Sequence, residues 1–213
     1  MSKKILFTFL SVFVVPVSLF AARPFVTDDA GTVEQGTFEL ETSSDYWKNT
    51  ASFGIGLKHG LTNRMDLGVA FGYDAVPKAS AAAQPLEVSF KYNFIPEHFS
   101  ASFTSAFSSS TYSINAIYSH DIKFLSLHAN VGLEATEGAK DVSGTYSLAA
   151  VFNIGIVAAG LEFGGVNKDI NWWQIGTQAA FTDWFALDIG VGGDFDNKMT
   201  ATTGLWFGFP LSK

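Results

Sequence analysis

Residues 65–74, MDLGVAFGYD, place a bulky apolar side chain at every second position. Only Gly, Ala and Asp stand between these bulky residues. A period of two predicts a β-strand, because successive side chains of a strand point to opposite faces. A soluble sheet would bury the apolar face and cover the other with long polar side chains, whereas a membrane barrel turns the apolar face to lipid and a small, polar face to its lumen. The small second face of this stretch favours the barrel.

Segments of the same period follow one another after residue 36. Their apolar faces run over residues 38–46, 53–57, 65–73, 86–94, 99–107, 112–118, 125–133, 146–152, 157–163, 173–181, 185–191 and 205–209. A tilted strand needs about 9 to 11 residues to cross a bilayer, so the pattern predicts a closed antiparallel β-barrel of about twelve strands within residues 37–213.

A soluble β-sandwich also alternates and is the main alternative fold. The opposite faces count against it, because they are small or polar and hold few long charged side chains, as in Ser52, Gly54, Gly56 and Lys58. Charged residues make up only 15% of the chain, against about 25% in an average soluble protein. Aromatic residues gather at the segment ends, as in the girdles of membrane barrels.

The connections between the segments alternate in length. Those after even-numbered segments are tight, such as NIG and TDW, whereas most of the others are longer or more polar. Bacterial outer-membrane barrels have an even number of strands, short periplasmic turns and longer outer loops. We therefore expect both chain termini on the periplasmic side.

Residues 1–22 have the order of a secretory signal peptide: two lysines, an apolar run, and then Ala21 and Ala22. A retained transmembrane anchor is the alternative, but the run is short and contains Pro16. No later stretch reaches the roughly 18 consecutive apolar residues that a spanning helix needs. We expect residues 1–22 to be cleaved and the mature chain to reside in the outer membrane.

Residues 23–213 contain 11 basic and 20 acidic residues, a net charge of −9, so nucleic acid is not an expected partner. The chain has no cysteine, which excludes disulfides and thiolate chemistry. Asp194 and Asp196 lack the further oxygen ligands of a calcium loop, and no helix follows the glycines of FGIGLKHG, so we expect neither a metal nor a cofactor. The expected partners are bilayer lipids and an unidentified small solute, and homo-oligomers remain open.

Alternate residues of each segment face the predicted lumen. The predicted lumen-lining residues are Glu39, Glu41, Asp45, Lys58, Asp66, Glu87, Lys91, His128, Glu134, Glu162 and Asp188. Charges of one sign focus the field in a narrow pore, so this acidic lining is expected to favour cations or neutral solutes. The alternative is a closed lumen in which the acids pair with Lys58, Lys91 and Arg23.

The start of the mature chain, RPFVTDDAGTVEQGTFELETSSDYW, and the later HGLTNRMDLGV resemble the outer-membrane family named after the meta-pathway of phenol degradation. The matching residues are Arg23, Pro24, Phe25, Thr27, Asp28, Asp29, Ala30, Gly31, Gly36 and Glu39. The resemblance implies an outer-membrane barrel that transports small solutes, aromatic compounds among them.

Residues 23–36 have no strand period. The simpler interpretation is a periplasmic tether in which Asp28 and Asp29 make local turns. The alternative is a small plug that folds into the lumen, with Arg23, Asp28 and Asp29 as its candidate contact residues.

The pattern favours a channel for the passive passage of small solutes. A non-conducting structural or anchoring barrel is the second hypothesis. An outer-membrane lipid hydrolase is the third, and it would need a serine and a histidine with an orienting group. His128 is predicted in mid-strand on the same face as Ser126 and Asn130, and lining the lumen is its simpler role.

Overall fold

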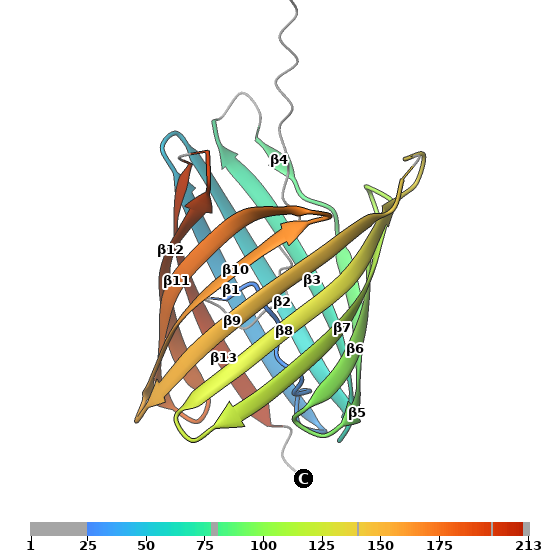
Figure 1. The fold of residues 1–213 in the computed structure, drawn as a ribbon. Helices are drawn as coiled ribbons and strands as arrows, with labels where there is room; N and C mark the ends of the chain where they lie inside the picture. Colours follow the sequence, from blue (N-terminus) through green and yellow to red (C-terminus); the bar gives the residue numbers. More distant parts are fainter. Residues whose placement is uncertain (1–24, 78–80, 140, 197, 211–213) are drawn as a thin grey trace, which may run out of the picture.

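The computed structural model describes residues 25–77, 81–139, 141–196 and 198–210, which form a barrel of tilted strands without helices (Figure 1). The strands are β1 (Thr37–Trp47), β2 (Thr50–Thr62), β3 (Met65–Val76), β4 (Ala82–Ala83), β5 (Glu87–Ile95), β6 (Phe99–Ala106), β7 (Thr111–Ile122), β8 (Leu125–Thr136), β9 (Ser143–Ile154), β10 (Val157–Val166), β11 (Asp169–Thr182), β12 (Phe185–Asp194) and β13 (Met199–Pro210). Arg23 and the predicted signal peptide lie outside the described residues.

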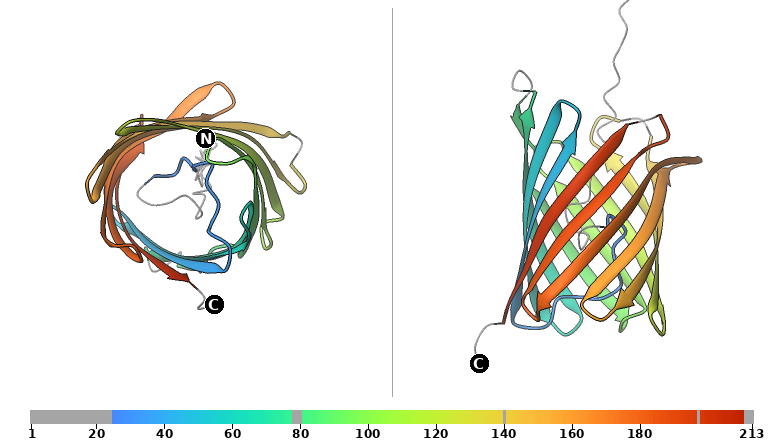
Figure 2. Two further views of the ribbon diagram at one scale, coloured as in Figure 1. Left: turned by 90° about the horizontal axis from the view of Figure 1, so that it is seen from below. Right: turned by 90° about the vertical axis from the view of Figure 1, so that its left-hand side faces the viewer.

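Antiparallel pairing runs around the whole wall and closes it. Each long strand pairs with its neighbours in the chain, and β1 pairs with β13 from Thr37↔Pro210 to Tyr46↔Ala201. Seen along the axis, the strands form a ring (Figure 2). The short strand β4 lies in the connection between β3 and β5 and extends only the end of β3, so twelve strands make the wall. The predicted closed antiparallel barrel is confirmed.

The two ends of the barrel differ in their connections. At one end, here called the turn end, residues 63–64, 96–98, 123–124, 155–156 and 183–184 link the strands, and β1 begins and β13 ends there. Tight hairpins require left-handed backbone, which Lys123 (φ 57°) and Gly155 (φ 60°) supply. The opposite end, the loop end, holds the longest connection, residues 77–86. Residues 48–49 and 167–168, also at the loop end, are as short as the turns, so the predicted alternation of short and long connections is only partly present.

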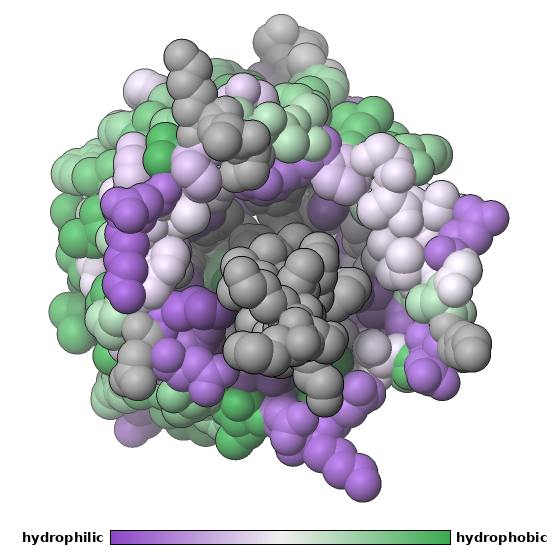
Figure 3. Space-filling model, turned by 90° about the horizontal axis from the view of Figure 1, so that it is seen from above, coloured by the Kyte–Doolittle hydropathy of each residue, from purple (hydrophilic) through white to green (hydrophobic). Residues whose placement is uncertain are grey.

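Side chains are distributed in the reverse of a soluble protein. Large apolar residues of the strands, such as Phe71, Ile114 and Leu133, are exposed on the outside, whereas Asp66 and Lys91 are buried on the inside. Figure 3 shows apolar residues around the outer surface and polar residues around the mouth. This distribution is that of a barrel whose outer face meets lipid. Among the described residues, no helix is long and apolar enough to cross a bilayer, a finding that does not bear on crossing by strands.

The inner face of β3 shows why its small residues are needed. Asp66, Gly68, Ala70 and Gly72 are all buried, although they lie on the lumen side of the wall. A side chain at position 72 would meet Gln84 of the long connection, whose amide bonds Asp74. The small face of residues 65–74 therefore leaves room for chain that folds into the barrel.

If the outer face of β8 contacts lipid, a lysine substitution should cost more at Val131 than at Val142. Val131, in the middle of β8, is 64% exposed on the outer face, whereas Val142, in the loop before β9, is 59% exposed. We expect Val131→Lys to lower the free energy of unfolding by about 2–4 kcal/mol, because the ammonium would enter the hydrocarbon, and Val142→Lys by about 1 kcal/mol or less. Denaturant unfolding in phospholipid vesicles measures both. Equal losses would contradict a lipid-facing β8.

Candidate functional site

The inner wall carries the residues that the sequence pattern assigns to it. Each predicted lumen-lining residue lies on the inward parity of its strand: Glu39, Glu41 and Asp45 on β1, Lys58 on β2, Asp66 on β3, Glu87 and Lys91 on β5, His128 and Glu134 on β8, Glu162 on β10, and Asp188 on β12. Six of them, Glu41, Lys58, Asp66, Lys91, Glu162 and Asp188, are buried. Since charges inside a wall must be paired or solvated, their partners define the site.

Residues 25–36, here called the lumen segment, lie inside the barrel. Figure 2 shows this part of the chain within the ring of strands. The segment ends beside β2, just before β1 begins. There Gly36 N–H donates to Gly60 O at 2.9 Å, and Gln35 forms a parallel bridge with Gly60. A side chain at position 60 would come within 2.1 Å of Glu34 O, so this close approach requires glycine.

Glu162 anchors the inner part of the segment. Its two carboxylate oxygens accept hydrogen bonds from the backbone N–H groups of Val26 and Thr27, both at 2.7 Å. Glu162 is only 1% exposed. A carboxylate that accepts two amide protons keeps its charge solvated by the segment itself, and in turn satisfies two donors that no strand pairs.

Lys91 holds the acidic part of the segment. Its ammonium donates to Asp28 Oδ1 at 2.9 Å, to Asp29 O at 3.1 Å and to Gly31 O at 2.9 Å. Three acceptors match the three protons of a lysine ammonium. Lys91 therefore pairs with a carboxylate and fixes the backbone on both sides of Ala30.

Uncharged polar side chains of the wall bind the remaining backbone. Asn130 exchanges two 2.8 Å hydrogen bonds with the N–H and C=O of Asp28. The carbonyl of Ala30 accepts from Asn93 and Ser100. Two further amides donate to the wall, that of Ala30 to Ser119 Oγ at 2.8 Å and that of Val33 to Asp66 Oδ2 at 3.0 Å. Side chains of β3, β5, β6, β7, β8 and β10 thus replace a strand partner for the segment.

The pKa values of the two neighbouring aspartates of the segment are shifted in opposite directions. Burial raises the pKa of Asp28 above its usual value, because the loss of water outweighs the attraction of Lys91. Burial acts in the same direction on Asp29, but Lys91 and the hydrogen bond from Gly31 N–H at 2.6 Å together hold the pKa of Asp29 below its usual value. The bond from Gly31 N–H to Asp29 Oδ1 also closes a local turn of the kind expected from the sequence.

The second lysine of the lumen pairs within the wall. Lys58 Nζ lies 3.1 Å from Glu41 Oε1. Glu39, on the same face of β1, is opposite Lys58 in the β1–β2 ladder. Toward the loop end, Glu87 of β5 and Glu134 of β8 lie on the inward parity of their strands. The lysines are thus engaged, and the charge left in the lumen is acidic.

His128 bonds a serine of the neighbouring strand β7, not Ser126 of its own strand β8. Its Nδ1 lies 2.8 Å from Ser119 Oγ, which already accepts the amide proton of Ala30. Ser126 Oγ instead accepts from Asn153 Nδ2 at 3.0 Å. The Ser119–His128 pair therefore supports the lumen segment.

Comparison with known proteins gives a likeness of fold. No family model matches the chain, and no curated protein matches it. Among solved structures it is similar to the KdgM porin, with 12% identity over 79% of this chain and 98% of the other and a TM-score of 0.63. An outer membrane channel from Pseudomonas putida F1 has 11% identity over 85% and 98%, with a TM-score of 0.62. The NanC porin has 11% identity over 79% and 98%, with a TM-score of 0.57.

The substitution Glu162→Gln tests whether Glu162 anchors the segment. In Glu162→Gln one side-chain oxygen becomes an NH₂ group that faces a backbone N–H, so we expect the segment to lose about 1–3 kcal/mol of local stability. Hydrogen exchange of the Val26 and Thr27 amides, read by NMR, should accelerate accordingly. Glu134→Gln changes a glutamate of the same wall outside the anchor and should leave both amides protected. Unchanged protection in Glu162→Gln would contradict the anchor.

Proposed function

We propose that this protein is an outer-membrane channel for the passive passage of small solutes, with the turn end toward the periplasm and the lumen segment narrowing the pore. The observation that carries the proposal is a polar, acidic lumen that surrounds a segment held by side chains. Backbone ladders join the strands of the wall, whereas side chains of the wall hold residues 26–33 of the segment, so the segment can leave the lumen while the wall stays closed.

The charge of the lumen supports a preference for cations or neutral solutes. Lys58 and Lys91 are both paired with carboxylates, so their charges are neutralised locally. Glu87 and Glu134 remain toward the loop end without a salt bridge in the described part of the chain. An acidic mouth raises the local concentration of cations and lowers that of anions. The resemblance to the phenol meta-pathway family extends the proposal to aromatic solutes.

A non-conducting anchoring barrel is the second candidate, and the lumen segment itself favours it, because chain inside the barrel occupies space that a solute would need. We assign no catalytic role, since Ser119 Oγ accepts the amide proton of Ala30 and His128 bonds the same hydroxyl. Whether such barrels associate as homo-oligomers is a separate question, which cross-linking in membranes answers.

Single-channel recording in a planar bilayer tests the role of the segment. We expect brief or small currents from the mature chain and a several-fold larger conductance from a chain that lacks residues 23–36, because the deletion removes the chain that crosses the lumen. Both proteins must show the same far-UV circular dichroism. Zero conductance from both would overturn the channel and support the anchoring barrel.

Reversal potentials in a salt gradient test the charge preference. The mature chain should pass K⁺ more readily than Cl⁻, and Glu87→Gln with Glu134→Gln should lower the K⁺/Cl⁻ permeability ratio by about twofold or more, because these substitutions remove two carboxylates from one mouth. Glu137→Gln, in the exposed loop after β8, is the matched control and should have little effect. A preference for Cl⁻ in the unmodified protein would contradict an acidic conduction path.

A further inference from the structure

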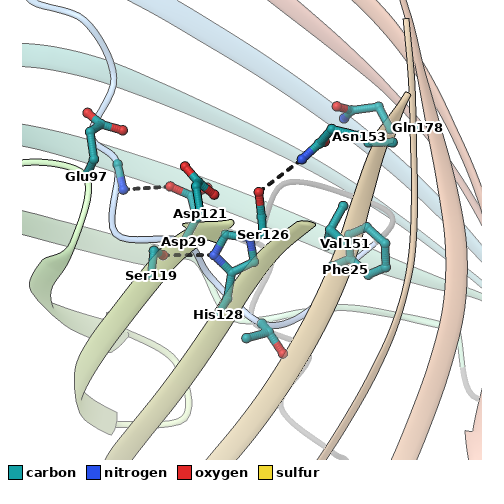
Figure 4. A pocket seen from close by; sticks show the side chains of 13 residues that line it. Phe25, Asp29, Glu97, Ser119, Asp121, Ser126, His128, Val151, Asn153 and Gln178 are labelled. Carbon is teal, nitrogen blue, oxygen red and sulfur yellow. Dashed lines mark hydrogen bonds between the residues drawn. The ribbon is translucent and has the colours of Figure 1, made fainter. Parts of the chain in front are cut away.

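A cavity of about 280 Å³ lies between the lumen segment and the turn end of the barrel (Figure 4). Alternate residues of the segment, Phe25, Thr27, Asp29 and Gly31, line it on one side. The rest of its wall comes from the turn-end parts of β7 to β11 and from the turn between β5 and β6. The cavity therefore exists only while the segment is seated in the lumen.

The two sides of this cavity differ in chemistry. Figure 4 shows Asp29, Glu97 and Asp121 together on one side and Phe25 with Val151 on the other. Among the described residues that line the cavity, none is a lysine or an arginine. Phe25 and Val151 are buried and form an apolar wall. A ligand that matches both sides carries a positive charge at one end and an apolar body at the other.

Thr27 adds a polar contact that the protein leaves unused. The residue is 4% exposed and lines the cavity, and its Oγ1 has no hydrogen-bond partner among the described residues. The other hydroxyls of the wall are engaged, Ser119 with His128 and Ser126 with Asn153. A buried hydroxyl without a partner costs free energy, which a ligand that donates or accepts a hydrogen bond there recovers.

The arrangement of the acids favours an organic cation over a metal ion. Within the described ranges, no three His, Cys, Asp or Glu side chains come close enough together to hold a metal. Carboxylates that are spread along one side attract a cation through space without enclosing it. The volume is near the lower limit of about 300 Å³ for small-molecule sites, which suits a ligand of roughly ten non-hydrogen atoms.

We propose that this cavity binds a small organic cation, with a primary ammonium beside Asp29, Glu97 and Asp121, an apolar body against Phe25 and Val151, and a hydrogen bond to Thr27. The site is formed jointly by the wall and the seated segment, so an occupied cavity stabilises the seated state. Binding requires no conduction and can be measured on a barrel that passes no current.

Isothermal titration calorimetry of the full mature chain in detergent micelles tests the charge requirement. The probes are 2-phenylethylamine, its neutral analogue 2-phenylethanol and the anion 3-phenylpropionate. We expect saturable binding of the amine at one site per chain, binding of the alcohol at least about tenfold weaker, and no saturable binding of the anion. Binding of the anion or the alcohol as tight as that of the amine would overturn the proposal.

Variants locate the site. Glu97→Gln with Asp121→Asn should weaken binding of 2-phenylethylamine by about tenfold or more, because two of the three carboxylates are neutralised while the hydrogen bonds that hold the segment are unchanged. Thr27→Val, which preserves shape, should weaken it several-fold. Asp183→Asn, an exposed acid in another turn at the same end, is the control and should bind as the unmodified chain does. Unchanged affinity in the double variant, or an equal loss in Asp183→Asn, would overturn the assignment.

Discussion

The closure of the backbone ladder between β1 and β13 is the constraint on which the rest of the structure depends. A strand edge cannot be left open in lipid, because each unpaired amide there costs several kcal/mol. Ten residue pairs from Thr37↔Pro210 to Tyr46↔Ala201 join the two ends of the sheet. Once the sheet is closed, one face of every strand must meet lipid and the other must enclose a lumen.

The same requirement explains the lumen segment. Residues 25–33 have no strand partner, so their buried amides and carbonyls need other partners. Glu162, Lys91, Asn130 and Asn93 provide them from the wall. Three buried charges of the wall, Glu162, Lys91 and Asp66, are in turn satisfied by the segment, which lowers the cost of their desolvation. Wall and segment are therefore one polar network, and a change in either exposes unpaired groups in the other.

Local pattern was sufficient to predict the wall. The period of two places residues 65–74 in a strand and puts Asp66 on its inner face; the structure confirms both and continues the strand to Val76. The strand β4 was not predicted, because two residues, Ala82 and Ala83, are too few to show a period. Whether a segment forms a strand depends on residues close together in the chain, so a single sequence is enough to predict it.

The contacts of the site were harder to predict from the sequence than the strands of the wall. Residues 25–36 lack a period, and Glu162 follows Thr27 by 135 residues, so no local signal links them. Of the two interpretations of this stretch, its contacts are those expected of a segment folded into the lumen. The Ser119–His128 pair is more local, because the hairpin between β7 and β8 places these residues opposite one another. Finding that pair requires the register of the hairpin, and its two turn residues are not the Asn, Asp or Gly that mark a tight turn.

The backbone of the lumen segment holds it against the wall of the barrel. The most direct measurement is NMR of the unmodified mature chain in lipid nanodiscs, observing the amide proton of Ala30. We expect nuclear Overhauser contacts from this proton to the β-protons of Ser119, whose Oγ lies 2.8 Å from Ala30 N. We also expect backbone order parameters of about 0.85 for residues 26–33. Absence of those contacts, with order parameters below about 0.6 in the same residues, would contradict a segment held against the wall.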